Sequence, residues 1–417
     1  MSAIVVDPTL DTVYAQDTRA PPSSLAELPC RTDVLIVGGG LTGLSAAYHL
    51  MESGLKVTLC DAGAIGDGAS GRNGGQLHTG QRRDQVWLEA MFGPKMADAL
   101  WRLGEEAIDL VHRLRRTLRA DCDFTPGLIE AAHTASAMDE LRAYADLLNT
   151  RYGVEHKLFN RDELAKAIGS SRYRGGARDP GGGHLNPLSL VTALANAVHV
   201  AGGHLIARAR VVGVVRRQSG YDVSVSAGQG GQHLVNAKNV ILSGNGMMGG
   251  LSPWLDSRIM PLRNYIVATV PLKQPLIPGR EAVADTRFVV RYFRQDRKGR
   301  MVFGGGETFG RPPQDVARFV RPYLAEIYPQ LRNTPLDAAW GGTLGITMQR
   351  LPIIRRLEPG PYVGAGFSGQ GVGLATFAGK VIADAIAGEA SRLDVFGRLP
   401  SPPFPGGPAL RAPTVHL

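Results

Sequence analysis

The stretch TDVLIVGGGLTGLSAAYHLMESGLKVTLCDAG, residues 32–63, decides the fold of this chain of 417 residues. It starts with a run of apolar and β-branched residues that ends in glycines, which is typical of a buried parallel strand. A glycine-rich turn then opens an amphipathic helix, and a second apolar strand follows the helix. This order of strand, turn, helix and strand is one βαβ unit, and it predicts an α/β fold with a Rossmann-like sheet.

The turn of this unit has the spacing of a dinucleotide-binding loop. Gly38 permits the tight turn, Gly40 lets the backbone approach a pyrophosphate, and Gly43 lets the helix pack against the strand. Asp61 ends the second strand, about 20 residues after the loop, where a carboxylate can accept hydrogen bonds from ribose hydroxyls. The unit therefore predicts a bound dinucleotide, although the motif fits NAD and FAD equally.

A long glycine-rich segment, AGAIGDGASGRNGGQLHTG at residues 62–80, follows the second strand. NAD enzymes of this fold usually continue with further short βα units, and this chain does not. The segment is suited to wrapping an extended ligand, because its side chains are small and its backbone N–H groups are free. A flexible loop is the alternative, but so long a run without secondary structure is usually functional in a compact protein.

These motifs resemble those of a known family. The stretches IVGGGLTGLSAA and GASGRNGGQ are similar to the FAD-dependent D-amino-acid oxidase/glycine oxidase superfamily, and more narrowly to its γ-glutamylputrescine oxidase branch. Three later stretches support the resemblance, which covers about residues 30–392: GGGHLNPLSLVTALANAVHVAGGHL, YFRQDRKGRMVFGGGE and WGGTLGITMQRLPIIRRLEPGPYVGAGFSGQGVGLATFAGKVIADAIAG.

The resemblance implies a Rossmann-like FAD-binding domain of the glutathione-reductase type, with an inserted α+β substrate domain whose sheet is mainly antiparallel. Three separated pieces would form the FAD-binding domain, and two insertions would form the substrate domain. An N-terminal arm and a Pro-rich, loosely attached tail would flank them. The expected pieces are 28–85, 175–258 and 351–392 for FAD, 86–174 and 259–350 for the substrate, 1–27 for the arm and 393–417 for the tail.

The resemblance also implies which residues hold the cofactor, which would be non-covalently bound FAD. The turn after the last strand, at 366–372, would face the flavin edge where negative charge develops, as a positive helix end. Its alternative is a second βα unit without ligand contact. No Cys follows Cys122, and His78 is not at the position of the covalent His of some relatives. The expected cofactor-binding residues are Gly38, Gly40, Leu41, Thr42, Gly43, Asp61, Ala62, Ala69, Ser70, Arg72, Asn73, Gly74, Gly75, Gln76, Val211, Ser243, Gly244, Gly366, Phe367, Ser368, Gly369, Gln370, Gly371 and Val372.

Amine oxidation by a flavin is a hydride transfer from the carbon beside nitrogen, and the chemistry belongs to the cofactor. The protein has to position that carbon and supply the neutral amine, so a strong catalytic base is not required. The candidates for the substrate pocket are Gln76, His78, Tyr265, Tyr292 and Trp340. Core packing is the alternative for each aromatic residue, and surface exposure is the alternative for His78.

One departure from the resembled family bears on the substrate. Amino-acid-oxidising members carry an Arg shortly after the Trp of this segment, which clamps the α-carboxylate in a bidentate pair. Here the segment reads WGGTLG, residues 340–345, without Arg. Arg350 lies nearby, where it would serve the flavin edge or packing, and Arg263, Arg291 or Arg294 could replace the clamp. The sequence therefore favours an amine whose carboxylate, if it has one, is remote.

The predicted function is oxidation of a primary or secondary amine to an imine and then an aldehyde, with O₂ reduced to H₂O₂. One alternative is a dehydrogenase that passes electrons to a quinone or protein. Another is a flavin-stabilised binding protein, because the formal net charge is +9. Its basic residues are scattered, however, so neither nucleic acid nor a membrane is expected as a partner. Three cysteines without CxxC disfavour a metal site, and the absence of a signal or long apolar run makes a cytoplasmic enzyme the default.

Overall fold

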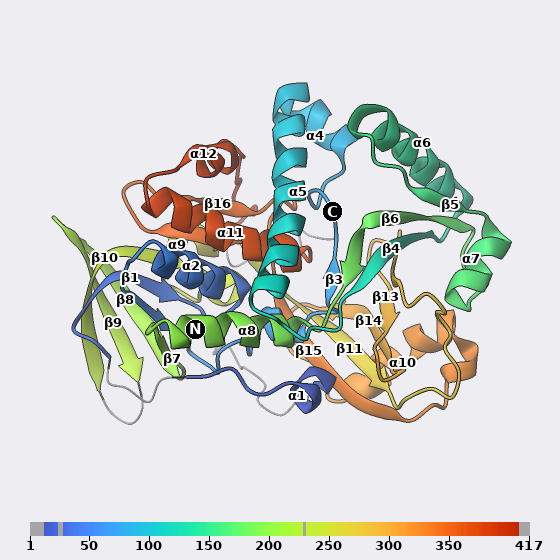
Figure 1. The fold of residues 1–417 in the computed structure, drawn as a ribbon, viewed down its shortest axis with the longest axis horizontal. Helices are drawn as coiled ribbons and strands as arrows, with labels where there is room; N and C mark the ends of the chain where they lie inside the picture. The colour runs from blue at the N-terminus through green and yellow to red at the C-terminus, as the bar shows by residue number, and fades with distance from the viewer. Residues whose placement is uncertain (1–11, 24–27, 228–230, 408–417) are drawn as a thin grey trace.

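The computed structural model describes residues 12–23, 28–227 and 231–407. Two sheets lie side by side in it, one in each half of the molecule, and the long helix α5 (Pro94–Thr117) stands between them (Figure 1). The predicted α/β architecture with a second, mainly antiparallel sheet is confirmed.

The first sheet contains the βαβ unit that the sequence predicts. Its order is β16-β17-β10-β1-β2-β7, and β8 and β9 add a hairpin beside β10. All pairings from β17 to β7 are parallel, so both faces of the sheet need cover. The strands are β1 (Arg31–Val37), β2 (Val57–Cys60), β7 (His204–Ile206), β8 (Ala209–Arg217), β9 (Gly220–Ala227), β10 (Gln232–Leu242), β16 (Ile353–Arg356) and β17 (Tyr362–Ala365).

Helices provide that cover on one face. Apolar residues from α2 (Leu41–Glu52), α8 (Pro187–Val200), α11 (Gly371–Ile386) and α5 join one buried core. The shorter α12 (Ser391–Gly397) packs against α11 and β16. The sequence pattern assigns α5 to the substrate domain, whereas in the structure this helix contributes to the core beneath the first sheet.

The second sheet has the order β15-β11-β14-β13-β12-β4-β6-β3, with β5 beside β6. One pairing, between β12 and β4, is parallel, and the others are antiparallel. The strands are β3 (Gln76–Leu77), β4 (Thr125–Ala132), β5 (Lys157–Phe159), β6 (Gly175–His184), β11 (Met260–Thr269), β12 (Ala282–Asp285), β13 (Tyr292–Gln295), β14 (Met301–Thr308) and β15 (Leu336–Ile346).

Two of the expected domain boundaries differ from the sheet pairing. The boundary at 175 places β6 with the first sheet, but β6 pairs with β3, β4 and β5 of the second. The boundary at 85 likewise assigns β3 to the first sheet. The sequence of β6, GGARDPGGGH, has no apolar alternation that would reveal a strand, and only pairing with its neighbours makes it one.

Helices also surround the second sheet. They are α4 (Gln85–Phe92), α6 (Ala135–Tyr152), α7 (Arg161–Ile168) and α10 (Val316–Ile327). The helical pattern after residue 85 is broken between α4 and α5, because Gly93 takes a φ of +79° and Pro94 begins α5. The remaining short helices are α1 (Val13–Asp17), α3 (Ala69–Arg72), α9 (Pro253–Asp256), and the 3₁₀ turns Asn245–Met247 and Pro329–Leu331.

Both ends of the described chain dock on this body. In the arm, Tyr14 of α1 is buried and packs edge-on against Trp340, with ring centroids 5.5 Å apart. In the tail, Phe404 is buried and its N–H donates to Ser257 O at 2.8 Å. The tail is therefore attached as far as residue 407, and not loose as expected. Residues 408–417, which the same expectation covers, lie outside the described residues.

No single helix in the described ranges is long and apolar enough to cross a membrane. The helices α11 and α12 meet the length and composition criteria when they are taken together, but a bend of 119° separates them.

Candidate active site

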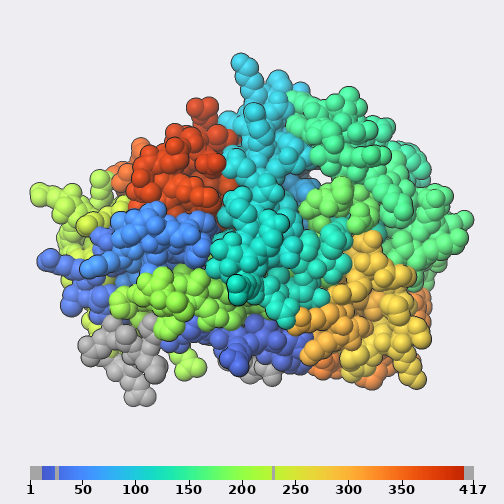
Figure 2. Space-filling view, viewed as in Figure 1, coloured from blue at the N-terminus to red at the C-terminus, as the bar shows by residue number. Residues whose placement is uncertain are grey.

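A cavity of about 1810 Å³ joins the two sheets. It begins at the glycine loop of β1, passes between the sheets, and extends to α4 and α6. The space-filling view shows a hollow between α4–α5 and α6 (Figure 2). A pocket for one small ligand is typically about 300–1,000 Å³, so this cavity has room for a dinucleotide and a substrate.

The glycine loop forms a cradle at the first end of the cavity. Gly40 has no side chain with which to cap α2, and Ser70 Oγ engages only Leu41 N, so the next N–H groups of the first turn are available to an anion. A Cβ on Gly40 would lie 2.6 Å from Ser70 Oγ, and one on Gly38 would lie 2.9 Å from Ser243 C. A Cβ on Gly43 would collide with Gly38 O. The loop therefore requires glycine at all three positions.

Asp61 and Ser70 hold this cradle in place. The Asp61 carboxylate accepts hydrogen bonds from Gly39 N at 2.6 Å and from Gly63 N at 2.7 Å, and it still lines the cavity. Ser70 Oγ accepts from Leu41 N at 2.9 Å. Burial raises the pKa of Asp61, and the two backbone donors oppose that rise. Each carboxylate oxygen keeps a free lone pair, which suits acceptance from ribose hydroxyls.

The segment 69–76 is held in a fixed conformation between the two sheets. Arg72 pairs with the Asp67 carboxylate and also donates to Asp67 O. Asn73 Nδ2 donates to Ala69 O and Ser70 O, and Asn73 Oδ1 accepts from Gly75 N. The segment is therefore an ordered wall of the cavity, and the flexible-loop alternative does not describe it.

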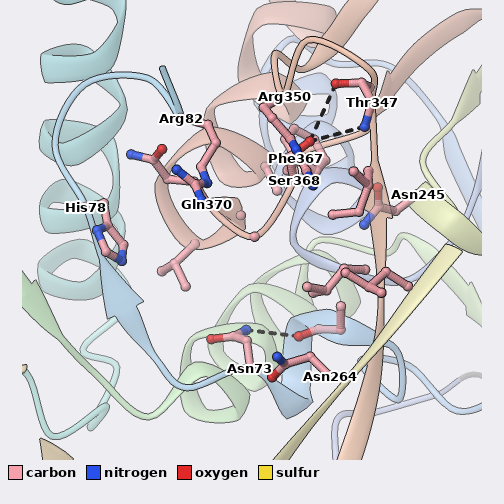
Figure 3. Close-up of a pocket in the computed structure, with 18 of the residues that line it drawn as sticks. Asn73, His78, Arg82, Asn245, Asn264, Thr347, Arg350, Phe367, Ser368 and Gln370 are labelled. Atoms are coloured by element: carbon pink, nitrogen blue, oxygen red, sulfur yellow. Dashed lines mark hydrogen bonds between the residues drawn. The ribbon is translucent and has the colours of Figure 1, made fainter. Parts of the chain in front are cut away.

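A second helix N-terminus faces the cavity at α11. The turn before it uses positive φ at Gly366, Ser368 and Gly369. Thr347 N and Thr347 Oγ1 both reach Ser368 Oγ, which fixes the turn against β15 (Figure 3). Gln370 caps α11 without a side-chain bond, so the positive end of the helix is directed at the space that the turn lines.

The residues present fit FAD. Two helix N-termini, a side-chain-free backbone cradle and an acidic residue at a strand end all open on the same cavity. Of the expected cofactor-binding residues, three do not line it: Gly43, Gly75 and Gly366. Each packs against neighbouring protein atoms, so these glycines shape the backbone. Those that line the cavity are Gly38, Gly40, Leu41, Thr42, Asp61, Ala62, Ala69, Ser70, Arg72, Asn73, Gly74, Gln76, Val211, Ser243, Gly244, Phe367, Ser368, Gly369, Gln370, Gly371 and Val372.

Among the substrate candidates, Gln76, His78 and Tyr292 line the cavity. Gln76 Nε2 donates to Val283 O at 2.8 Å, and Tyr292 Oη donates to Asn264 Oδ1 at 2.5 Å. Desolvation and the neighbouring charge of Arg82 lower the pKa of His78 to about 4. His78 is therefore a neutral imidazole at physiological pH.

The other two candidates face elsewhere. Along β11, Leu262, Asn264 and Ile266 line the cavity, so Tyr265 points to the opposite face, as the two-residue period of a strand requires. There it packs edge-on against Phe319 of α10. Trp340 is fully buried under α1, and its indole N–H donates to Arg72 O at 2.8 Å. Neither aromatic residue is placed to touch a substrate, and Trp340 supports the segment 69–76 instead.

The three arginines that could replace a carboxylate clamp also face away from the cavity. Arg263 shares the outer face of β11 with Tyr265. Arg291 stacks over the Tyr323 ring at 4.0 Å. Arg294 is buried beneath the segment 69–76, where it donates to Gly74 O at 2.7 Å. At the segment where the resemblance led us to look for a clamp, Gly342, Thr343 and Leu344 of β15 line the cavity.

Charged residues that the sequence reading missed also line the cavity. Glu307 lies beside Asn264, which donates to its carboxylate, and burial raises the pKa of Glu307. Arg82 follows β3 and Glu130 lies on β4, and both side chains are exposed to the cavity. Arg350, which was expected to serve the flavin edge or packing, lies beside the 366–370 turn (Figure 3). The missed residues stand far apart in sequence and belong to no motif. In the described ranges, no group of three or more His, Cys, Asp or Glu could hold a metal.

Comparisons with known proteins agree with this geometry. The family model "FAD dependent oxidoreductase" matches residues 33–385. The chain is 39% identical to a probable oxidoreductase OrdL of Rhizobium meliloti, over 93% of this chain and 90% of that protein. It is 35% identical to γ-glutamylputrescine oxidoreductase of Escherichia coli, over 91% of this chain and 89% of that protein.

Solved structures show the same fold at lower identity. Glycine oxidase from Geobacillus kaustophilus superposes with a TM-score of 0.71 at 22% identity, over 86% of this chain and 95% of that chain. L-proline dehydrogenase from P. horikoshii gives 0.70 at 23% identity, over 88% and 96%. FAD is therefore the dinucleotide that the cavity holds, and the chain belongs to the FAD-dependent oxidoreductase family that these motifs define.

Proposed function

We propose that this enzyme oxidises the C–N bond of an alkylamine that carries no carboxylate beside the reacting carbon, such as a γ-glutamylated or other substituted diamine. The relative named γ-glutamylputrescine oxidoreductase, 35% identical, supports an amine of this class. The substrate loses a hydride from carbon and a proton from nitrogen to become an imine. Water then hydrolyses the imine to an aldehyde and a released amine.

The observation that carries this proposal is the cavity face of β15. Gly342, Thr343 and Leu344 form it, and none of them carries a positive charge that could form a bidentate ion pair with a carboxylate. An α-carboxylate in this position would lose its hydration without gaining a bidentate partner, which costs several kcal/mol per buried charge. An uncharged alkyl group meets no such penalty against glycine and leucine.

Bound FAD supplies the two-electron acceptor, and the protein supplies position and polarity. The uncapped N-terminus of α11 places partial positive charge at the turn 366–370. Glu307 offers an acceptor for the N–H groups of the incoming amine, and Tyr292 and Asn264 hold the polar side of the same wall. We propose O₂ as the final acceptor, reduced to H₂O₂ by two electrons and two protons.

Flavin reduction without oxygen tests the substrate class. Putrescine derivatives and other alkylamines are compared by stopped flow with glycine, sarcosine and D-alanine at matched concentrations. We expect kcat/KM for the best amine to exceed that for each amino acid by at least about 100-fold. An unpaired carboxylate costs several kcal/mol, and each 1.36 kcal/mol or so lowers kcat/KM about tenfold.

The variant Arg263→Gln is the control, because Arg263 faces away from the cavity and should not change the ratio. Equal reduction by small amino acids would mean that an unrecognised clamp exists, and the amine assignment would give way to an amino-acid oxidase. Reoxidation of the reduced enzyme in air and with a quinone then tells O₂ from another acceptor.

A further inference from the structure

Two opposite charges face the cavity without a protein partner. Arg82, on the loop after β3, and Glu130, on β4, are both exposed, and both line the cavity. Neither makes a side-chain ion pair or hydrogen bond with any of the described residues. Because both groups are exposed, water hydrates them, and a ligand with complementary charges can replace that water with charge-assisted hydrogen bonds.

Neighbouring residues of the same charge are already engaged. Arg83 donates to Gln349 O at 3.0 Å and its guanidinium lies 4.7 Å from the centroid of the Trp87 ring. Arg287 pairs with the carboxylates of Asp285 and Glu326. Arg82 and Glu130 therefore differ from Arg83 and Arg287, whose side chains already have protein partners.

The charges of Arg82 and Glu130 interact electrostatically, although the two side chains form no ion pair or hydrogen bond with each other. Burial lowers the pKa of Arg82, and Glu130 is the strongest charge that opposes the decrease. Burial raises the pKa of Glu130, and Arg82 is the strongest charge that opposes that rise. A cation and an anion that face one cavity can together bind a group that carries both charges.

Arg82 faces the cavity from the loop after β3, near the turn before α11, and Glu130 faces it from β4. Figure 3 shows Arg82 beside Gln370, while Asn73 and Asn264 lie at the other end of the view. Beyond Arg82 the cavity continues between β4, β6 and α6, with Tyr144, Asp179 and Leu148 in its lining. A substrate whose amine reaches the strand face of β15 would place its far end in this extension.

We propose that Arg82 and Glu130 form a subsite for an α-amino carboxylate head group of the substrate, remote from the oxidised C–N bond. The carboxylate pairs with the Arg82 guanidinium, and the ammonium pairs with the Glu130 carboxylate. The inference rests on the proposed function, since it assigns the far end of the same amine. It also explains why the cavity has an arginine, Arg82, although β15 has none next to the reacting carbon: the carboxylate would lie at the far end of the substrate.

Four compounds with the same oxidisable amine test the subsite. They are γ-glutamylputrescine, its head N-acetyl derivative, its head carboxamide, and putrescine without any head. In the wild type, removal of either head charge should lower kcat/KM on the order of tenfold to a hundredfold, the range of a hydrogen bond to a charged group. The loss should appear mainly in KM, because the head is remote from the reacting atoms.

The variants give a crossed pattern. Arg82→Gln should bring the carboxylate and carboxamide compounds to the same kcat/KM and keep the effect of N-acetylation. Glu130→Gln should bring the free-amine and N-acetyl compounds to the same kcat/KM and keep the difference between carboxylate and carboxamide. The matched controls Arg83→Gln and Glu140→Gln should keep both effects, because Arg83 is engaged and Glu140, on α6, accepts from Ser136.

A second measurement separates this proposal from the proposed function. γ-Glutamylbutylamide has the head but no oxidisable terminal amine, and its Kd can be measured by calorimetry on the FAD-loaded enzyme. We expect tenfold or more weakening in Arg82→Gln. If wild type shows no head preference, or if both variants weaken all four compounds equally, the subsite is wrong even though amines reduce the flavin. If no amine reduces the flavin but the head still binds through Arg82, the proposed function fails and the subsite stands.

Discussion

At the residue scale, we expect FAD binding to depend directly on Gly40. Its hypothetical Cβ lies 2.6 Å from Ser70 Oγ, the atom that accepts from Leu41 N at the start of α2. We expect Gly40→Val to displace this cradle and raise the FAD dissociation constant at least about 100-fold, or about 2.7 kcal/mol. The measurement is FAD content and fluorescence titration of the apoprotein. Gly397→Val is the control, because no atom lies within 4 Å of its Cβ. Normal FAD content in Gly40→Val would show that the loop does not meet the phosphates.

His78 makes stability depend on pH in a defined window. Its pKa falls from 6.5 to about 4 in the folded protein, because of desolvation and Arg82, while Asp179 opposes the decrease. Between these two values the unfolded chain binds a proton that the folded chain does not, so stability is lost as the pH falls from 6.5 to 4. The contribution is at most about 3 kcal/mol.

We expect His78→Asn to flatten that part of the curve of Tm against pH, measured at a fixed FAD concentration. Glu130 and Glu307, whose pKa values are raised, act in the opposite direction, but they remain in both proteins. The difference between the two curves therefore isolates His78. Parallel curves from pH 7 to pH 4 would contradict the assignment of a buried neutral imidazole.

The element α1 ties the arm to the cofactor segment. Tyr14 Oη donates to Asn73 O at 2.9 Å, and its ring packs on Trp340, whose N–H donates to Arg72 O. We expect Tyr14→Phe to cost about 2 kcal/mol of unfolding free energy, because packing is kept and two hydrogen bonds are lost, the one donated to Asn73 O and the one accepted from Arg294. Tyr14→Ala should cost about 3–5 kcal/mol, since it also leaves a cavity.

Urea unfolding measures both changes, and FAD content reports whether the segment 69–76 has moved. A loss of FAD in Tyr14→Ala with less loss in Tyr14→Phe is the expected order. Equal stability of the two variants and the wild type would show that α1 does not support the sheet. Asp17, at the end of the same helix, pairs with Arg300 and Lys298, so the helix has a second attachment.

For the whole molecule, FAD is expected to act as part of the core. Its cavity of about 1810 Å³ is lined by elements of both sheets, so bound FAD would contact both of them. At free FAD 1,000 times the dissociation constant, binding adds about 4.1 kcal/mol of stability. Tm should rise with FAD concentration in thermal unfolding, and acid precipitation should release free FAD. An apoprotein as stable as the holoprotein would mean that FAD contacts far less of the cavity.

The sequence by itself determined the features that are local in the chain. The βαβ unit, the glycine positions, Asp61 and the turn before α11 are each specified within a short segment, by period, spacing and the conformational freedom of glycine. The FAD-dependent family and the class of fold follow from these segments, and both are confirmed. The absence of an arginine in WGGTLG can likewise be read directly.

Tertiary structure alone decided which side chains share a space. Tyr265 and Leu262 belong to the same strand, and only the packing of α10 against one face tells which of them is directed to the cavity. β6 is a strand because its backbone finds partners, although its glycine-rich sequence has no strand pattern. Arg82 and Glu130 carry no signal in the sequence, since their relation arises when β3 and β4 are placed around one cavity. Electrostatic pairing acts through space over distances that the order of residues does not encode.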